Sequence, residues 1–525
     1  MFGFIPVIIL LSAAIAVVVL NFVPRGPGIA WLVAILASVI AWIITLLFKN
    51  RLPFNLSFHS LDSLGAAYLF PFLQIDIISW PIAFMICAVT ISLLIVSSAR
   101  IGRDADCWEW AGILLLGALG YLASQTGNLL TVILLIGIFD IVDIGFLSFS
   151  GKTNEEFSFN ITNSVWHFVS LILLIISLAW NSSLPDVSDD WKSIQPGPMY
   201  LILASCVIRM VMLPINKVTG SPRETKEGLF ISRICMDMCI TLSVLFRLSV
   251  PTNNTAIKSG FLLYLLGISI FAIIVLLIGK TSSNAAVLKI VFACMIMSEF
   301  LYGFSASGIQ LLICSIGIFL VLVLQYPVNT FSKIVGVLAL ASFSGLPFTP
   351  NNTGYSGFTV KGQIPGIIFL IPATLLFYYS IKKTLKKENF ENPEGERWAV
   401  YLSPTGLIFP IISSWIILLQ WMPGLFRLNI VIQPIIVTVA GFVIFFFERM
   451  NLFNFESGIA SGKTLYLKLL EKSQFSRFSF FSGFQNKLSL PISTINNLLE
   501  GDGGILWAIL CLVLVITILQ SLGMS

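Results

Sequence analysis

Ionisable side chains interrupt the apolar segments of this sequence at membrane depth. An ion at the centre of a bilayer costs at least about 2.5 kcal/mol even on lenient insertion scales, so such residues usually pair with one another or line a path for protons or ions. Stretches long and apolar enough to cross a bilayer contain Asp140, Asp143, Arg209, Arg233, Asp237, Lys289 and Glu299. These seven residues are the candidate proton or ion path.

The seven side chains differ in the chemistry that they offer. A buried lysine can exchange its proton near neutral pH, whereas arginine stays charged. Lys289 is therefore the best proton carrier and Glu299 the second, but ten residues of helix separate them by about 15 Å, so a transfer between them needs water. His167 is a candidate relay, although a histidine in an apolar helix also serves simply as a hydrogen-bonded core residue.

Two further features concern local pairing and metals. Arg233 and Asp237 are four residues apart, a spacing that allows an ion pair on one helix face. Cys235 and Cys239 are also one turn apart, but no histidine or further cysteine has metal-ligand spacing to them. We expect free thiols and neither a metal nor a cofactor bound by this chain.

Composition places these residues in a membrane protein. The chain of 525 residues is 57% hydrophobic and only 10% charged, whereas soluble domains carry about 25% charged residues. The apolar run from Phe261 to Ile278 shows no two-residue alternation, which excludes a transmembrane β-barrel. The fold class is therefore an all-α polytopic membrane protein in a lipid bilayer.

Apolar segments of roughly 17 to 25 residues predict about 16 transmembrane helices, with a range of 14–16. The predicted spans are 4–22, 28–48, 73–97, 109–124, 127–149, 162–181, 199–215, 228–250, 257–279, 285–306, 308–326, 331–347, 362–385, 398–421, 430–448 and 505–522.

Charge distribution predicts the orientation. Most of the 30 Lys and Arg residues fall in odd-numbered loops or at the adjoining helix ends, and the positive-inside rule places those loops in the cytoplasm. Both termini are then predicted on the non-cytoplasmic side of a plasma or inner membrane. The net charge of +5 follows from this bias and calls for no nucleic acid partner.

The region 449–504 differs from the spans around it. It mixes leucines and phenylalanines with basic residues, among them Lys463, Lys468, Lys472 and Arg477. This pattern favours an amphipathic segment lying along the cytoplasmic interface, with a plain solvated tether as the alternative. A last transmembrane helix is predicted within 505–525.

Two spans carry helix-breaking sequence, at Arg209 to Pro214 and at Ser344-Gly345-Leu346-Pro347. Proline removes a backbone donor and clashes with the preceding turn. In a membrane the freed groups must be satisfied by protein or by a water-filled cavity, and broken helices in two halves of a chain often mark a transport site. Pro214, Gly345 and Pro347 are thus the predicted broken-helix positions.

These residues resemble those of the antiporter-like membrane subunits of respiratory complex I and of the Mrp-type cation/proton antiporters. The family carries a lysine five residues before a proline, where this sequence has Arg209 and Pro214. A second family pattern, a lysine followed by an apolar run that ends in Ser-Gln-Leu-Gly-Tyr, resembles Lys289 through Ser298-Glu299-Phe300-Leu301-Tyr302. The family's Gly-x-Pro on the second broken helix resembles Gly345 to Pro347.

The resemblance covers roughly residues 70 to 385, where Asp76 corresponds to an acid that opens the family's third helix, and extends to the tail. It implies two inverted five-helix repeats, each with a broken helix, and pairing of Arg209 with Asp140 or Asp143. The implied division is 1–108 for the N-terminal helices, 109–250 and 257–385 for the repeats, 398–448 for additional helices, 449–504 for the interfacial segment and 505–525 for the last helix.

The sequence departs from the family at several proton-handling positions. Gly137 stands where the family has a glutamate, Asn216 where it has a histidine, and Tyr355 where it has a lysine ten residues after Gly345. Another family histidine falls near Ser232 or Arg233. The resemblance therefore implies the family's scaffold with much of its proton-handling set replaced.

Two functional hypotheses follow. In the first, the chain conducts protons, or exchanges them for Na⁺, along the seven buried charged residues within a complex I-related assembly. In the second, those charges form fixed pairs and the chain is a non-conducting structural subunit of such a membrane arm. The sequence contains no catalytic constellation, so redox chemistry, in an NADH:quinone oxidoreductase-like complex for example, belongs to partner subunits. Proton-driven uptake with a carbon-hydrating partner is a further use of this scaffold.

Overall fold

The computed structural model describes most of the chain up to Met450. The described residues are 2–23, 26–57, 72–97, 107–150, 154–182, 191, 194–211, 227–248, 255–278, 284–324, 330–359, 366–385, 402, 404–421 and 432–450. They all belong to one compact unit, Met1–Phe455. Pro214, Asn216, the predicted interfacial segment at 449–504 apart from its first two residues, and the predicted last helix lie outside the described residues.

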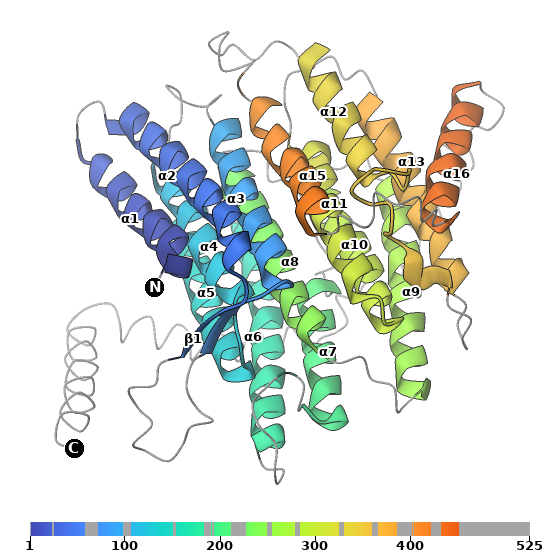
Figure 1. Ribbon diagram of the computed structural model, residues 1–525, viewed down its shortest axis with the longest axis horizontal. Coiled ribbons are helices and arrows are strands. Elements are labelled where there is room, and N and C mark those ends of the chain that lie inside the picture. The colour runs from blue at the N-terminus through green and yellow to red at the C-terminus, as the bar shows by residue number, and fades with distance from the viewer. Residues whose placement is uncertain are drawn as a thin grey trace. The chain divides into compact units, whose positions relative to one another are not determined.

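The described chain is almost entirely helical (Figure 1). Its first eight α-helices are α1 (Ile5–Leu20), α2 (Gly26–Phe48), α3 (Ser79–Val96), α4 (Cys107–Ser124), α5 (Leu129–Ser150), α6 (Asn154–Ser182), α7 (Pro196–Val211) and α8 (Glu227–Arg247). The others are α9 (Thr255–Ile278), α10 (Asn284–Leu301), α11 (Ser305–Val323), α12 (Thr330–Phe343), α13 (Leu370–Leu385), α15 (Ile408–Trp421) and α16 (Ile432–Arg449). Short 3₁₀ turns occupy Phe2–Phe4, Lys49–Arg51, Ser356–Thr359 and Gly366–Phe369.

The helical membrane fold predicted from the sequence is confirmed. Each predicted span before residue 450 overlaps one of these helices. Among the described residues, ten helices are long and apolar enough to cross a membrane, and four shorter ones are also apolar. Several expected boundaries differ, and the third is wrong in kind: that span was placed from residue 73, but residues Phe72–Ile75 form a strand and α3 begins only at Ser79.

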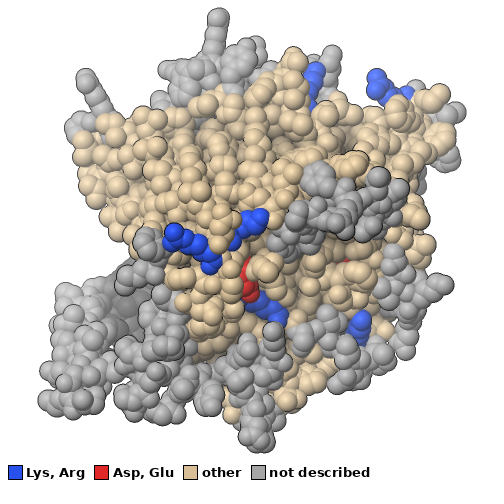
Figure 2. Space-filling view, in the orientation of Figure 1, with Lys and Arg blue, Asp and Glu red and all other residues tan. Residues whose placement is uncertain are grey.

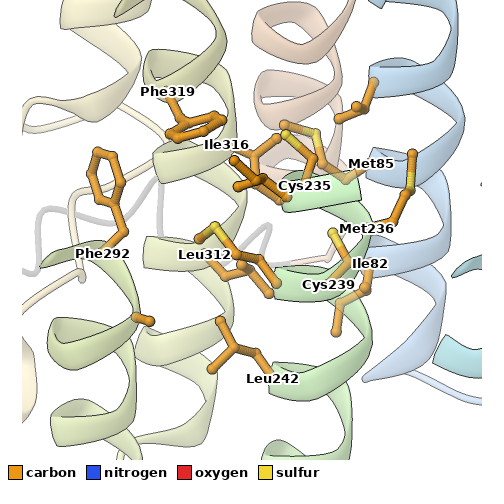
Figure 3. Close-up of a cluster of buried hydrophobic side chains, with 14 of the residues drawn as sticks. Ile82, Met85, Cys235, Met236, Cys239, Leu242, Phe292, Leu312, Ile316 and Phe319 are labelled. Atoms are coloured by element: carbon orange, nitrogen blue, oxygen red, sulfur yellow. The ribbon is translucent and has the colours of Figure 1, made fainter. Parts of the chain in front are cut away.

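The helices sort into a buried centre and a periphery. Almost every described residue of α3, α8, α10 and α11 is buried, whereas α1, α2, α5, α6, α9 and α16 leave large apolar side chains exposed on one face. Figure 3 shows the centre, where Ile82 and Met85 of α3 meet Cys235 and Met236 of α8. In Figure 2 the described surface carries a few scattered Lys and Arg groups and a small patch of Asp or Glu atoms on an otherwise uncharged face. Both features suit a bundle surrounded by lipid.

A β-hairpin, which the sequence patterns did not predict, lies between α2 and α3. Strand β1 (Phe54–Ser57) pairs antiparallel with β2 (Phe72–Ile75), with Phe54 opposite Ile75. The connection between α4 and α5 continues the hydrogen bonding: Gln74 donates its N–H to the Gln125 carbonyl at 2.6 Å, and Gly127 donates to the Phe72 carbonyl at 2.7 Å. A side chain at Gly127 would overlap the Phe72 ring. The hairpin is thus attached to one end of the bundle.

The backbone at Ser344 to Pro347, where the sequence predicted a break, is not helical. Helix α12 ends at Phe343, and the chain continues through turns until residue 359. The groups freed by the break are satisfied locally, since the Asn351 side-chain N–H donates to the Phe343 carbonyl at 2.8 Å and Gly345 donates its N–H to the Thr438 hydroxyl at 2.9 Å. Phe348 and Tyr355 adopt positive φ angles of 67° and 68°. Non-helical backbone is thereby accommodated inside the protein, as a membrane requires.

Candidate functional site

Arg209 lies at the centre of a buried network of charged side chains. It stands in the last turn of α7, where a cation interacts favourably with the carbonyl end of the helix. Its Nη1 and Nη2 atoms donate to the two carboxylate oxygens of Asp140 on α5, at 2.9 and 2.6 Å, and its Nε atom donates to Asp237 Oδ1 on α8 at 2.5 Å. The expected contact between Arg209 and an acid of the fifth helix is therefore present, in the bidentate geometry that suits guanidinium.

Lys289 joins the same network from α10. Its Nζ atom donates to Asp237 Oδ2 at 2.5 Å and lies 3.5 Å from the Arg209 carbonyl oxygen. Lys289 is 9% exposed and Asp237 only 1%. Asp237 therefore bridges two cations, and the set of Asp140, Asp237, Arg209 and Lys289 carries no net charge. This balance of charge allows the four ions to be buried in the low-dielectric interior, where each of them alone would be disfavoured by several kcal/mol.

His167 on α6 links the two carboxylates. Its Nδ1 atom is 3.2 Å from Asp140 Oδ1, and its Nε2 atom is 3.8 Å from Asp237 Oδ2. The ring is buried. Because each ring nitrogen faces a different acid, the histidine is placed as a relay would be, and not merely against a backbone carbonyl.

A second ion pair joins Asp143 and Arg233. The Nε atom of Arg233 lies 2.7 Å from Asp143 Oδ2, which connects α8 to α5. The ion pair between Arg233 and Asp237 that their spacing allowed does not form, because Asp237 is turned toward Arg209 and Lys289. The helix-face spacing was correct, but side chains of other helices competed for both residues.

Glu299 does not join the central network. It is buried near the end of α10, where its Oε2 atom accepts the N–H of Gly357 at 2.9 Å. Tyr355, at the position of the family's expected lysine, is also buried and stacks on Phe358 with 5.7 Å between ring centroids. The sequence placed seven residues on one path; six of them fall into the two ion-paired groups and Glu299 stands apart.

Other buried polar groups escaped the sequence analysis. Arg247, at the end of α8, lies 3.8 Å from Asp76 Oδ1 and donates to the carbonyls of Gln74 and Ser124 at 3.3 Å each. The Ser170 and Ser205 hydroxyls are 2.8 Å apart between α6 and α7. Arg247 could have been recognised from the sequence, because it is a charged residue at the end of an apolar span. Two serines within apolar helices give no such indication.

The acids of the network are engaged by cations, which leaves them poorly suited to a metal ion. Among the described residues, no three His, Cys, Asp or Glu side chains are grouped as metal ligands. One carboxylate, that of Asp237, instead contacts both His167 and Lys289, two residue types that can gain and lose protons.

Comparison with known proteins identifies the fold. No family model and no curated protein sequence matches the chain. Among solved structures, a chain of the Mrp complex from Dietzia sp. DQ12-45-1b aligns with a TM-score of 0.67 at 11% identity, covering 100% of this chain and 63% of that one. This chain therefore spans less than two thirds of that relative's length.

Two respiratory assemblies show the same fold. A chain of the archaeal membrane-bound sulfane sulfur reductase aligns with a TM-score of 0.63 at 12% identity, covering 97% of this chain and 99% of that one. A chain of respiratory complex I from Thermus thermophilus aligns with a TM-score of 0.59 at 12% identity, covering 83% and 99%. The resemblance drawn from four short motifs is thus confirmed at the level of the fold.

Proposed function

We propose that the chain is a proton-translocating, antiporter-like subunit of a multi-subunit membrane complex. The observation that carries this proposal is the position of His167, between the carboxylates of Asp140 and Asp237, which also contact Arg209 and Lys289. The network is buried, neutral and drawn from five helices, α5, α6, α7, α8 and α10. Similar folds in an Mrp complex and in respiratory assemblies support the same class of function.

A proton can cross this network without creating a lasting charge. A proton that binds His167 adds one positive charge to a neutral set, and release of a proton from Lys289 on the other side of Asp237 removes it. Lys289 is then reprotonated as His167 gives up its proton. Arg209 stays charged throughout and holds both carboxylates in place, so in this scheme it is a positioning residue.

Other membrane subunits are the proposed partners. A chain of this fold carries no redox centre of its own in our scheme, so the driving reaction or ion gradient would be supplied by other chains. The interfacial segment predicted at 449–504 is proposed as a brace against one of them. We place the protein in a plasma or inner membrane with both termini on the non-cytoplasmic side, and take H⁺ as the ion, with Na⁺ exchange as the variant.

One observation favours the structural alternative. Arg209 replaces the lysine of the resembled family and makes three charge-assisted hydrogen bonds with Asp140 and Asp237. Such bonds are about twice as strong as neutral ones and could simply hold α5, α7 and α8 together. Under this second hypothesis the chain completes a membrane arm and conducts nothing.

Substitution of Lys289 separates the two functions. The assembled complex is reconstituted into vesicles, and proton movement is followed with a pH-sensitive dye. Lys289→Arg keeps the positive charge beside Asp237 but cannot release a proton, so we expect normal assembly with proton movement reduced at least tenfold. Lys382→Arg, in the α13–α16 pair with Glu448, is the matched control and should behave as wild type. Unchanged proton movement in Lys289→Arg would refute conduction through this network and favour the structural role.

A further inference from the structure

Glu299 is a buried acid without a matching cation among the described residues. The acids of the candidate path are otherwise matched, Asp140 and Asp237 by Arg209 and Lys289, and Asp143 by Arg233. Glu299 is 0% exposed, and the groups that hydrogen-bond its carboxylate, the Gly357 N–H and the Ser307 hydroxyl, are neutral. A carboxylate in such a place needs a compensating positive charge.

The segment after α12 brings two more buried oxygens close to this carboxylate, those of the Asn351 amide and the Tyr355 hydroxyl. The Asn351 amide is oriented by its N–H, which donates to the Phe343 carbonyl, and this leaves Asn351 Oδ1 as a buried acceptor without a donor in the described structure. The buried hydroxyl of Tyr355 lies within hydrogen-bonding reach of the Asn351 side chain, and it interacts electrostatically with Glu299. A buried acceptor left without a donor is disfavoured, and a bound ligand would relieve this.

Glycines leave room for these oxygens. A Cβ atom at Gly354 would overlap Asn351 Oδ1, and one at Gly357 would lie 2.8 Å from Glu299 Oε2. Tyr355 is held at φ 68° between these glycines, a conformation that is strained for a non-glycine residue and that clusters at functional sites. The local backbone is therefore shaped around the carboxylate and the amide oxygen.

We propose that Glu299, Asn351 and Tyr355 form a binding site for a dehydrated monovalent cation, for which Na⁺ is the probe. Hard cations prefer oxygen ligands, and divalent ions are usually held by more than one carboxylate, so a single acid matches a single charge. Unwound backbone beside a broken helix is where membrane proteins commonly bind such ions. The site is separate from the network around Arg209, and the inference holds whether or not that network conducts protons.

Two other sources of positive charge make different predictions. A proton on Glu299 would neutralise the carboxyl group and would produce no cation binding. Lys361, which lies outside the described residues, would compensate Glu299 as an internal ion pair and would also exclude Na⁺. A substitution of Lys361 tests the second possibility directly.

Equilibrium binding of ²²Na⁺ to the purified complex, in choline buffer and without any gradient, tests the proposal. We expect saturable binding, a loss of one site per chain in Glu299→Gln, and an affinity at least tenfold weaker in Asn351→Ala. Lys361→Ala and the control Glu448→Gln should bind as wild type. Failure of wild type to bind Na⁺, or binding by Glu299→Gln equal to wild type, would overturn the site. Because no gradient is applied, neither result depends on proton conduction.

A stability measurement guards against misfolded variants. Ligands that bind only the folded state raise its apparent stability. Na⁺ in place of choline should therefore raise the thermal unfolding midpoint of the wild-type complex but not that of Glu299→Gln. An equal rise in both proteins would place the cation elsewhere and contradict the assignment.

Discussion

The carboxylate of Asp237 is shared between two cations: its Oδ2 atom lies 2.5 Å from Lys289 Nζ, and its Oδ1 atom accepts from Arg209 at 2.5 Å. Arg209 and Lys289 come from helices that have their own neighbours, α7 beside α6 and α10 beside α9. The central helix α8 thus supplies the acid that joins them. Loss of the Asp237 carboxylate should therefore affect both Arg209 and Lys289.

Asp237→Asn is expected to destabilise the folded protein strongly. The substitution leaves Arg209 and Lys289 with one carboxylate between them, and breaking a buried pair typically costs about 3–5 kcal/mol. We expect a clearly lower thermal unfolding midpoint in detergent, partly restored in the double variant Asp237→Asn with Lys289→Met, which removes the surplus charge. A double variant no more stable than the single one would contradict the shared-carboxylate interpretation.

Arg209→Lys tests the arginine at the position of the family's lysine. Lysine keeps the charge but replaces three guanidinium hydrogen bonds by fewer, so we expect a loss of about 1–3 kcal/mol in unfolding free energy. Under the proposed function, lysine adds a group able to exchange protons, so proton movement per assembled complex should equal or exceed that of wild type. Movement abolished by this change would mean that the fixed arginine is itself required.

His167→Gln removes the relay while keeping a polar side chain of similar size. Glutamine can still form hydrogen bonds to Asp140 or Asp237 but cannot accept and pass on a proton. We expect normal assembly and a reduction of proton movement by at least tenfold, measured in vesicles as for Lys289→Arg. The neighbouring change Ser170→Ala, which affects only the pair with Ser205, is the control and should leave proton movement intact.

Gly345→Ala should disturb the broken helix. A Cβ atom at Gly345 would overlap Pro434 of α16, including its backbone, and overpacking of this kind costs about 1–3 kcal/mol. We expect a lower unfolding midpoint. Gly267→Ala in α9 is the matched control, because a Cβ atom there meets nothing within 4 Å and alanine has the higher helix propensity. Equal stability of the two variants would show that the α12 break tolerates a side chain.

Much of the fold could be predicted because the composition of a segment is enough to identify a membrane-spanning helix. A run of apolar residues near the length of the bilayer leaves the backbone no alternative to a helix, so the spans before residue 450 were each located. The β-hairpin was not, since β1 and β2 are only four residues each and are stabilised by hydrogen bonds to the distant Gln125 and Gly127. The composition of a short segment does not require it to form a strand in the same way.

The sequence by itself determined that Asp140, Arg209, Asp237 and Lys289 must be sheltered, because isolated ions are disfavoured in hydrocarbon. It did not determine which residues pair. Local spacing predicted an ion pair between Arg233 and Asp237, whereas the packing of α5 against α8 pairs Arg233 with Asp143. Only the tertiary structure decided these partners, and it also separated Glu299 from the network, since Coulomb energy depends on distances between helices that no spacing along the chain records.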